Sequence, residues 1–315
     1  MIETRAPAPP LWASLAAPLV RALPRGRYRA MNRLCRGTTA RFVAPLPASA
    51  TGLRFECDLR NSLAREVYFT GRYEPQETAL VRQLLSPGDT FVDVGAHWGY
   101  FSLLAAERLG PTGRVVAIEA DPRVFGVLER TCALNQLDRL TAVHAAVADG
   151  PGELTLAGFD ERQDNWGLSR LVLDSEAGQG GEDAATSYRV RAAALDDLLD
   201  EQGVGVVDLV KMDIEGAEAL ALRGMRRGRE SGRYRRLLIE LHPEALPAFG
   251  TTAADLVALI LASGYRGYTV DHSLAAGRRA AYAANLKAEA LLRPLDPAAP
   301  LDAWPHLLFV RAENA

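Results

Sequence analysis

The chain has 315 residues, of which 48% are apolar and 24% charged, and its formal net charge is −3. This length is ample for one large domain with a buried core, and the charge balance carries no overall signature of nucleic-acid binding. The three cysteines, Cys35, Cys57 and Cys132, are few, odd in number and far apart. They argue against a disulfide framework or a cysteine metal site and favour a reducing, cytoplasmic compartment.

Residues 1–50 are predicted to form a basic N-terminal arm. Residues 1–45 contain eight of the 36 basic residues and one of the 39 acidic residues, so the rest of the chain carries a net charge of about −10. The spacing predicts a broken, basic amphipathic helix over residues 11–36, which either packs weakly on the body or makes a weak contact with a membrane surface or partner. No stretch reaches the roughly 18 to 20 apolar residues of a membrane span.

Residues 51–315 are predicted to form one domain. Short apolar runs alternate with helical patterns, which predicts an α/β fold of the Rossmann-like kind, with a doubly wound, mostly parallel sheet. An inserted loop or hairpin is expected at about residues 150–192, where Asp, Asn, Gly and Ser interrupt this alternation. The predicted strands are residues 51–59, 90–94, 113–118, 140–145, 153–157, 188–191, 206–212, 236–241, 265–270 and 304–311. The predicted helices are residues 75–85, 100–109, 122–134, 195–201, 217–225 and 251–264.

Ligands of such a sheet bind beyond the carboxyl ends of its strands. The first predicted strand of the alternation ends in Asp93-Val94-Gly95-Ala96-His97-Trp98-Gly99, where glycines allow a tight turn and a close backbone approach to a ligand. A dinucleotide site prefers G-x-G-x-x-G, but Ala96 stands directly after the first glycine. The pattern favours a ligand without phosphates, whose amino group Asp93 would balance. A plain strand-to-helix turn is the alternative.

Two further acidic residues follow the next two predicted strands. Glu119 ends the second strand, where a carboxylate can accept two hydrogen bonds from a ribose diol. Asp149 follows the third strand, near the expected position of an adenine edge, although it is equally well placed as a turn residue before Gly150. These positions predict a nucleoside-binding edge of the sheet.

The fourth strand ends in Lys211-Met212-Asp213-Ile214-Glu215-Gly216. Strand alternation would place Lys211, Asp213 and Glu215 on one side, where the lysine would lower the pKa values of the carboxyls. Two carboxylates in one cleft can act as a general base, hold a divalent metal through oxygen or orient sugar-like hydroxyls. A structural ion cluster that caps the next helix is the alternative.

The fifth strand ends in Glu240-Leu241-His242-Pro243, which topology brings close to Asp213. A histidine of near-neutral pKa suits the removal of a proton from an alcohol, and a hydrogen-bonded structural histidine is the alternative. Residues 165–169 of the insert are expected either to close over an acceptor or to form an ordinary surface excursion.

Together these motifs resemble the class I methyltransferases that use S-adenosylmethionine (AdoMet), and more fully the FkbM type. The resemblance covers about residues 55–245 plus a last strand, and it is carried by FVDVGAHWGYFSLLAAERLG, VVAIEADP, AVADGPGELTL, AALDDLL, DLVKMDIEGAE and LLIELHP. It implies O-methylation of a hydroxyl on a small molecule or glycan, with His242, Asp213 and Glu215 on the acceptor side. The implied cofactor residues are Asp93, Gly95, Ala96 and Gly99 around the methionine, Glu119 at the ribose and Asp149 near the adenine. FkbM proteins commonly carry Asn at the position of His97.

Three other functions are consistent with parts of this sequence. An NAD-dependent oxidoreductase is disfavoured by the missing middle glycine, and a methyltransferase-like protein that only binds a partner is disfavoured by the intact Asp93, Glu119, Asp213 and Glu215. An RNA methyltransferase is suggested by the basic arm, but the acidic body and the lack of an Asn-Pro-Pro-Tyr-type motif disfavour it, so no specific nucleic acid is expected. The motifs leave the acceptor, a metal requirement and the oligomeric state open.

Overall fold

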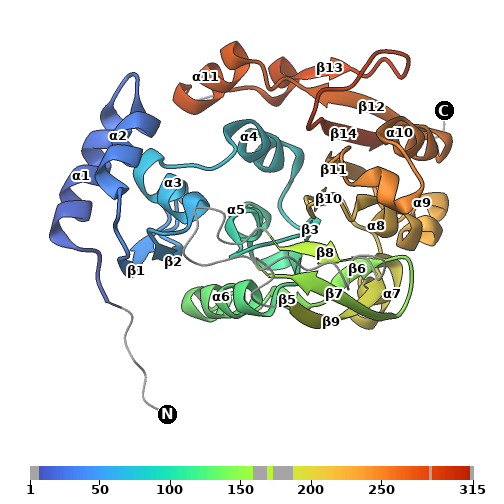
Figure 1. Cartoon of the computed structure of the whole chain (residues 1–315), viewed down its shortest axis with the longest axis horizontal. Helices are drawn as coiled ribbons and strands as arrows, with labels where there is room; N and C mark the ends of the chain where they lie inside the picture. The colour runs from blue at the N-terminus through green and yellow to red at the C-terminus, as the bar shows by residue number, and fades with distance from the viewer. Residues whose placement is uncertain (1–6, 159–168, 173–186, 284–285, 313–315) are drawn as a thin grey trace.

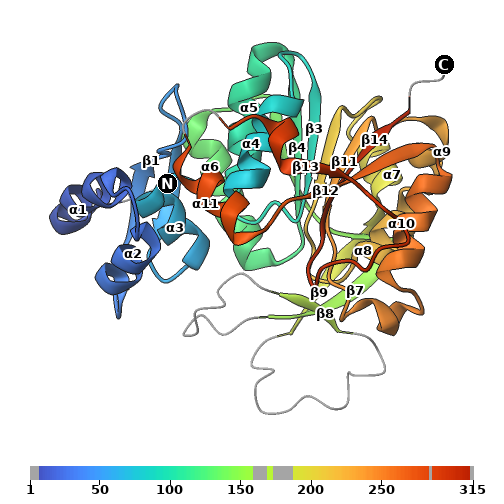
Figure 2. The same cartoon turned by 90° about the horizontal axis from the view of Figure 1, so that it is seen from above.

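The computed structural model describes residues 7–158, 169–172, 187–283 and 286–312. Its centre is an eight-stranded sheet of order β13-β12-β14-β11-β10-β3-β4-β5, seen in Figures 1 and 2. The strands from β11 to β5 pair in parallel, whereas β14 lies antiparallel between β11 and β12. The bounds are β3 (Thr90–Val94), β4 (Arg114–Glu119), β5 (Leu140–His144), β10 (Leu209–Met212), β11 (Arg236–Glu240), β12 (Tyr265–Val270), β13 (Leu292–Pro294) and β14 (His306–Arg311).

Helices cover both faces of this sheet, which confirms the predicted doubly wound fold (Figure 2). One face packs against α4 (Pro75–Leu84), α5 (Tyr100–Leu109) and α6 (Pro122–Asn135), and the other against α7 (Leu195–Glu201), α8 (Glu218–Gly224) and α10 (Ala253–Ala262). The short α9 (Arg226–Ser231) packs on α7 and α8. Successive strand residues serve opposite cores, since Phe91 belongs to the first and Val92 and Val94 belong to the second. Each strand is therefore apolar on both sides.

The N-terminal part adds a layer at one end of the molecule (Figure 1). The predicted broken helix is confirmed as α1 (Leu11–Ala22) and α2 (Arg27–Cys35), and the predicted strand at 51–59 is confirmed as β2 (Arg54–Asp58). Both helices contact α3 (Ser62–Thr70), which with β1 (Arg41–Pro45) was not predicted. The apolar side chains that α1 and α2 bury in the first core are Ala13, Ala17, Val20, Met31 and Cys35.

The predicted insert contributes β7, β8 and most of β9 to a second, four-stranded sheet of order β6-β9-β7-β8, whose β6 precedes the insert. Its strands are β6 (Ala146–Ala148), β7 (Gly152–Ala157), β8 (Arg170–Val172) and β9 (Ser187–Ala194). The expected returning strand is β9, while β8 was not predicted. Of the residue 165–169 segment, only Ser169 lies within the described residues, so its expected closing role stays a prediction.

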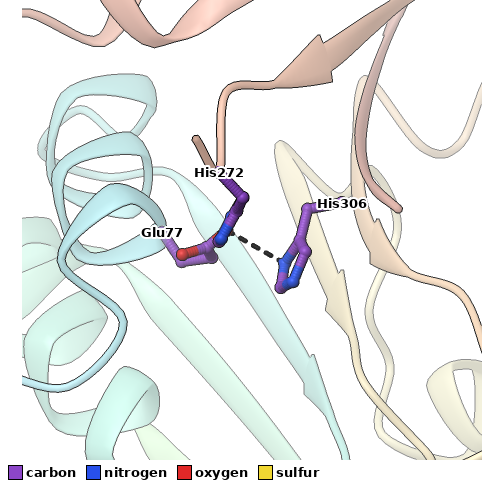
Figure 3. Close-up of side chains that lie close together, drawn as sticks. All are labelled: Glu77, His272 and His306. Carbon is purple, nitrogen blue, oxygen red and sulfur yellow. Dashed lines mark hydrogen bonds and ion pairs between the residues drawn. The ribbon is translucent and has the colours of Figure 1, made fainter. Parts of the chain in front are cut away.

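A buried carboxylate joins α4 to the C-terminal strands (Figure 3). Glu77 Oε1 accepts hydrogen bonds from His272 Nε2 at 2.7 Å, and it lies 3.0 Å from His306 Nδ1. The two imidazole rings stack with centroids 3.8 Å apart and planes at 17°, and each directs one nitrogen to the same carboxylate oxygen. Burial alone would raise the pKa of Glu77, but the two histidines lower it to about 2, and Glu77 raises the pKa of His306 against its burial.

Glu77→Gln is expected to lower the free energy of unfolding by about 3 kcal/mol, because it removes the buried carboxylate that pairs with the half-buried His306 and with His272. The contribution of Glu77 is present above its ordinary pKa of 4.5 and falls towards pH 2. That of His306 is present below its ordinary pKa of 6.5 and is lost as pH rises through its raised value. Urea denaturation should therefore show the largest difference in stability between Glu77→Gln and wild type at a pH between 4.5 and 6.5. The exposed Glu129→Gln serves as control, and equal stability of wild type and Glu77→Gln at pH 5.5 would contradict the account.

Candidate functional site

A cavity of about 270 Å³ opens at the carboxyl ends of β3, β4 and β10, where the sequence placed its candidate residues. Its walls come from the glycine turn, the ends of these strands, the start of α3 and the insert sheet. The lining residues used below are Ser62, Leu63, Tyr73, Gly95, Ala96, His97, Phe101, Glu119, Asp121, Ala145, Ala146, Val147, Ser169, Lys211, Asp213 and Glu215.

The glycine turn lies against the loop that follows β10. Gly95 has φ +81°, and a Cβ built there would lie 1.9 Å from the carbonyl oxygen of Asp213, so any side chain would force the two segments apart. The peptide N–H groups of Gly95 and Ala96 both donate to the Ile118 carbonyl, at 3.0 and 2.9 Å. Gly99 precedes α5 as its N-cap, with φ +96°, and a Cβ built there would lie 2.8 Å from the end of the Leu128 side chain. Packing against backbone thus requires glycine at 95, which lines the cavity, while the left-handed backbone favours glycine at 99.

His97 contributes its backbone to the turn. Its φ of +52° is the left-handed conformation, which asparagine adopts several times more readily than most residues. Its N–H donates to Glu119 Oε2 at 2.9 Å. An exchange between His and the Asn that is common in FkbM proteins therefore preserves this backbone contact.

Glu119 is held with both carboxylate oxygens in use. Oε1 accepts from the Asp121 N–H at 2.8 Å and Oε2 from the His97 N–H at 2.9 Å, which leaves acceptor capacity on each oxygen for a diol. Burial raises the pKa of Glu119 to about 7, against these backbone hydrogen bonds. Asp121 also lines the cavity, where it caps α6 and accepts a hydrogen bond from Ser169.

Three predicted cofactor residues are not among those that line the cavity: Asp93, Gly99 and Asp149. Asp93 lies beside Lys211 in the strand register, accepts from Ser102 Oγ at 2.6 Å, and has its pKa raised by burial. Asp149 is exposed beyond β6. Where the sequence placed an acid near adenine, the described wall consists of Ala145, Ala146 and Val147.

The other end of the cavity is acidic. Lys211 Nζ lies 3.3 Å from Asp213 Oδ2 and 4.6 Å from the centre of the Phe101 ring. The strand ends at Met212 and Glu215 has φ +50°, so the expected strand alternation through Glu215 is wrong, although all three polar residues line the cavity. Lys211 and His242 lower the pKa of Asp213 against its burial. Burial and Asp213 raise the pKa of Glu215, so the expected lowering by Lys211 applies only to Asp213.

His242 lies behind these carboxylates, which confirms its predicted proximity to Asp213. Its Nδ1 donates to Glu218 Oε1 at 2.8 Å and its Nε2 is 3.5 Å from Glu215 Oε2. Burial would lower the pKa of His242, but Glu218 and Glu215 raise it to about 9. The near-neutral pKa expected of a general base is therefore wrong, because the imidazole is protonated at neutral pH.

Sequence reasoning missed two residues of this cluster. Glu218 is fully buried and also accepts from the Gly216 N–H at 3.0 Å; its only signal was its place in the first turn of the helix after the acidic loop. Glu74 groups with Asp213 and Glu240 within 4.8 Å, and burial raises the pKa values of Glu74 and Glu240 to about 8. Glu74 precedes the first strand of the alternation and carried no signal.

The charge of the cavity distinguishes between cofactors. Four carboxylates line it, those of Glu119, Asp121, Asp213 and Glu215, whereas the cationic Lys211 is paired and no described lining residue is an arginine. Such a wall attracts a ligand with sulfonium and ammonium charges and repels the pyrophosphate of a dinucleotide. The carboxylates that line the cavity therefore fit AdoMet.

The comparisons with known proteins agree with this geometry. Residues 93–267 match the FkbM methyltransferase domain family. Methyltransferase sdnD of Sordaria araneosa is 32% identical over 160 residues, which cover 44% of this chain and 61% of that protein. The AMB antimetabolite synthetase AmbE of Pseudomonas aeruginosa is 26% identical over 208 residues, or 58% of this chain and 10% of that protein. The matches thus span about three fifths of the first relative and a tenth of the second.

Among solved structures, fibrillarin of Aeropyrum pernix with natively bound S-adenosyl-L-methionine resembles the chain at a TM-score of 0.38 and 13% identity. The match covers 74% of this chain and 73% of fibrillarin. The sheet differs from the dinucleotide-binding order 3-2-1-4-5-6 by the antiparallel β14, which lies between β11 and β12. The fold and cavity define a class I methyltransferase domain. The chain belongs to the FkbM methyltransferase family.

The affinity for AdoMet is expected to fall as Glu119 becomes protonated. Both oxygens of Glu119 can accept hydrogen bonds from the ribose hydroxyls only when the carboxyl group is ionised. AdoMet binding should therefore be strongest above the Glu119 pKa of about 7 and weaken about tenfold or more towards pH 5.5. Glu119→Gln should weaken binding about tenfold at pH 8 and lose this part of the pH dependence. Titration calorimetry measures both, with the exposed Glu153→Gln as control; a Glu119→Gln profile that matches wild type would contradict the assignment.

Proposed function

We propose that the protein is an AdoMet-dependent methyltransferase that methylates a hydroxyl group on a small molecule or glycan. The observation that carries the proposal is the cavity itself, with Glu119 at one end and the carboxylates of Asp213 and Glu215 at the other. Family membership supports methyl transfer. The hydroxyl acceptor rests on the resemblance to FkbM proteins and on the suitability of paired carboxylates for binding and deprotonating an alcohol.

AdoMet, when bound, supplies an electrophilic methyl group. Glu119 would hold the ribose hydroxyls, and the wall formed by Ala145, Ala146 and Val147 would contact the adenine. The close fit of Gly95 against Asp213 supports a cofactor that would extend from these contacts towards the acidic end. Orientation of an acceptor there contributes through proximity to the methyl donor.

Glu215 is our candidate for the proton acceptor. Its pKa is raised, which makes it a better base than Asp213, and its Oε2 lies 3.5 Å from protonated His242. Glu218 holds the imidazole from the other side, so His242 would position Glu215 and stabilise its charge. Asp213, ionised beside Lys211, would accept a hydrogen bond from the acceptor hydroxyl.

The reaction is proposed to need no divalent metal. Asp213, Glu215 and His242 offer atoms within 4.8 Å of one another, as do Glu74, Asp213 and Glu240, and these are the groups that would hold an ion. The ammonium of Lys211, however, already balances charge at Asp213, and the protonated His242 lies beside Glu215. Activity should therefore survive EDTA.

Labelled AdoMet should transfer its methyl group to a hydroxyl-bearing fraction of the host's polysaccharides and secondary metabolites. Glu215→Gln should lower this transfer at least about 100-fold by removing the proton acceptor, while AdoMet affinity changes less than about threefold. In wild type the rate should rise through the raised pKa of Glu215 and fall near pH 9, where His242 loses its proton.

Glu129→Gln provides the matched control, because Glu129 is exposed on α6 and outside the cavity lining, and it should retain full activity. A rate that continues to climb above pH 9 would instead assign the base role to neutral His242. Label that enters RNA alone, or no acceptor at all, would contradict the proposed substrate class.

A further inference from the structure

The helix α1 points its large apolar side chains away from the protein. Leu11, Leu15 and Leu19 are 76%, 62% and 70% exposed, and Trp12 and Leu23 are exposed beside them. Their spacing of four residues puts the three leucines on one helix face. Small side chains make the contact with the body, since Ala13 and Ala17 are buried. The three leucines and Leu23 form an outward face, which we call the leucine face (Leu11, Leu15, Leu19 and Leu23), whereas the Trp12 ring beside it stacks on Phe69 with centroids 6.1 Å apart.

The charge around the leucine face is of one sign. Residues 7–40 contain no acidic residue and six arginines, whereas the body of the chain is acidic. The arginines that are exposed are Arg25, Arg29, Arg33 and Arg36. Figures 1 and 2 place α1 and α2 together at one end of the molecule, away from the central sheet.

A basic pocket begins where α1 ends. Its cationic lining residues are Arg21, Arg27, Arg72, Arg82 and Lys287, and no carboxylate is among its described lining residues. Backbone carbonyls hold all four guanidinium groups: Arg21 donates to Tyr68 at 3.1 Å, Arg27 to Ala281 at 3.1 Å, Arg72 to Ala280 at 3.2 Å, and Arg82 to Ala48. Arg82 also lies 3.7 Å from Glu107. Such a pocket suits phosphate oxygens.

We propose that α1 and α2 dock the protein on an anionic lipid bilayer, with the leucine face at the boundary between headgroups and acyl chains and the arginines on lipid phosphates. An exposed apolar helix face bordered by cations is the pattern of interfacial helices, and each arginine near an anionic surface adds attraction. A protein partner would have to match six cations with acidic groups, whereas an anionic bilayer offers such groups without a specific arrangement. No described helix is long and apolar enough to cross a membrane, so this contact is peripheral.

Docking would also bring the candidate site close to the bilayer. Both α1 and α2 contact α3, and Ser62 and Leu63 at the start of α3 line the cavity. The bilayer surface is therefore separated from the cavity wall by one helix.

Co-sedimentation with vesicles tests the proposal. The full chain should bind phosphatidylcholine vesicles that contain about 30% phosphatidylglycerol at least about tenfold more tightly than pure phosphatidylcholine vesicles. Leu15→Gln/Leu19→Gln should weaken this binding at least about tenfold, and Arg25→Gln/Arg29→Gln should remove most of the preference for phosphatidylglycerol. Free inorganic phosphate at millimolar concentration should leave vesicle binding within about threefold, since the leucine face needs a bilayer.

The matched control is Leu259→Gln, because Leu259 is 38% exposed on α10 at the opposite end of the molecule. Its vesicle binding should equal that of wild type, and all variants should keep wild-type AdoMet affinity, which separates this proposal from the proposed function. Wild type that ignores the anionic vesicles, or a leucine double variant that binds them as wild type does, would overturn it. So would a concentration-dependent dimer that the double variant abolishes in the absence of vesicle binding.

Discussion

The contact between Gly95 and the Asp213 carbonyl is the constraint on which the candidate site depends. A Cβ at Gly95 would lie 1.9 Å from that oxygen, and the Asp213 N–H donates to the Val94 carbonyl at 3.1 Å. The turn that would face the cofactor and the loop that would face the acceptor are thus two sides of one backbone contact. Because glycine has no side chain, the ends of β3 and β10 can approach this closely.

Buried charge then sets the chemistry of each carboxylate. Lys211 is the single lysine among them, and it stabilises Asp213 in its ionised form while Glu215 has a raised pKa. When two carboxylates in one cavity have different pKa values, one can bind the acceptor while the other takes up its proton. Glu218 likewise sets the charge of His242, because it raises the pKa of the imidazole and keeps it protonated.

The predictable part of the fold was the alternation of β3, α5, β4, α6 and β5, because parallel strands buried on both faces read as continuous apolar runs. The short β1 and α3 were missed, since they depend on packing against α1 and β2 and have weak patterns of their own. The positions of Glu119, Asp213, Glu215 and His242 followed from the strand ends. The pKa of His242 did not, because it depends on Glu218, whose contact with the ring exists only in the folded chain. Asp149 was placed near the adenine by its position in sequence, yet β6 carries the chain past the cavity before that residue.

The most direct test of the account is the choice between cofactors, since an acidic cavity without a described arginine is the property that sets this sheet apart from a dinucleotide site. Titration calorimetry of the full chain with AdoMet and, separately, with NAD measures that choice. The account predicts saturable binding of one AdoMet per chain and no measurable heat from NAD. Binding of NAD in the absence of AdoMet binding would contradict it.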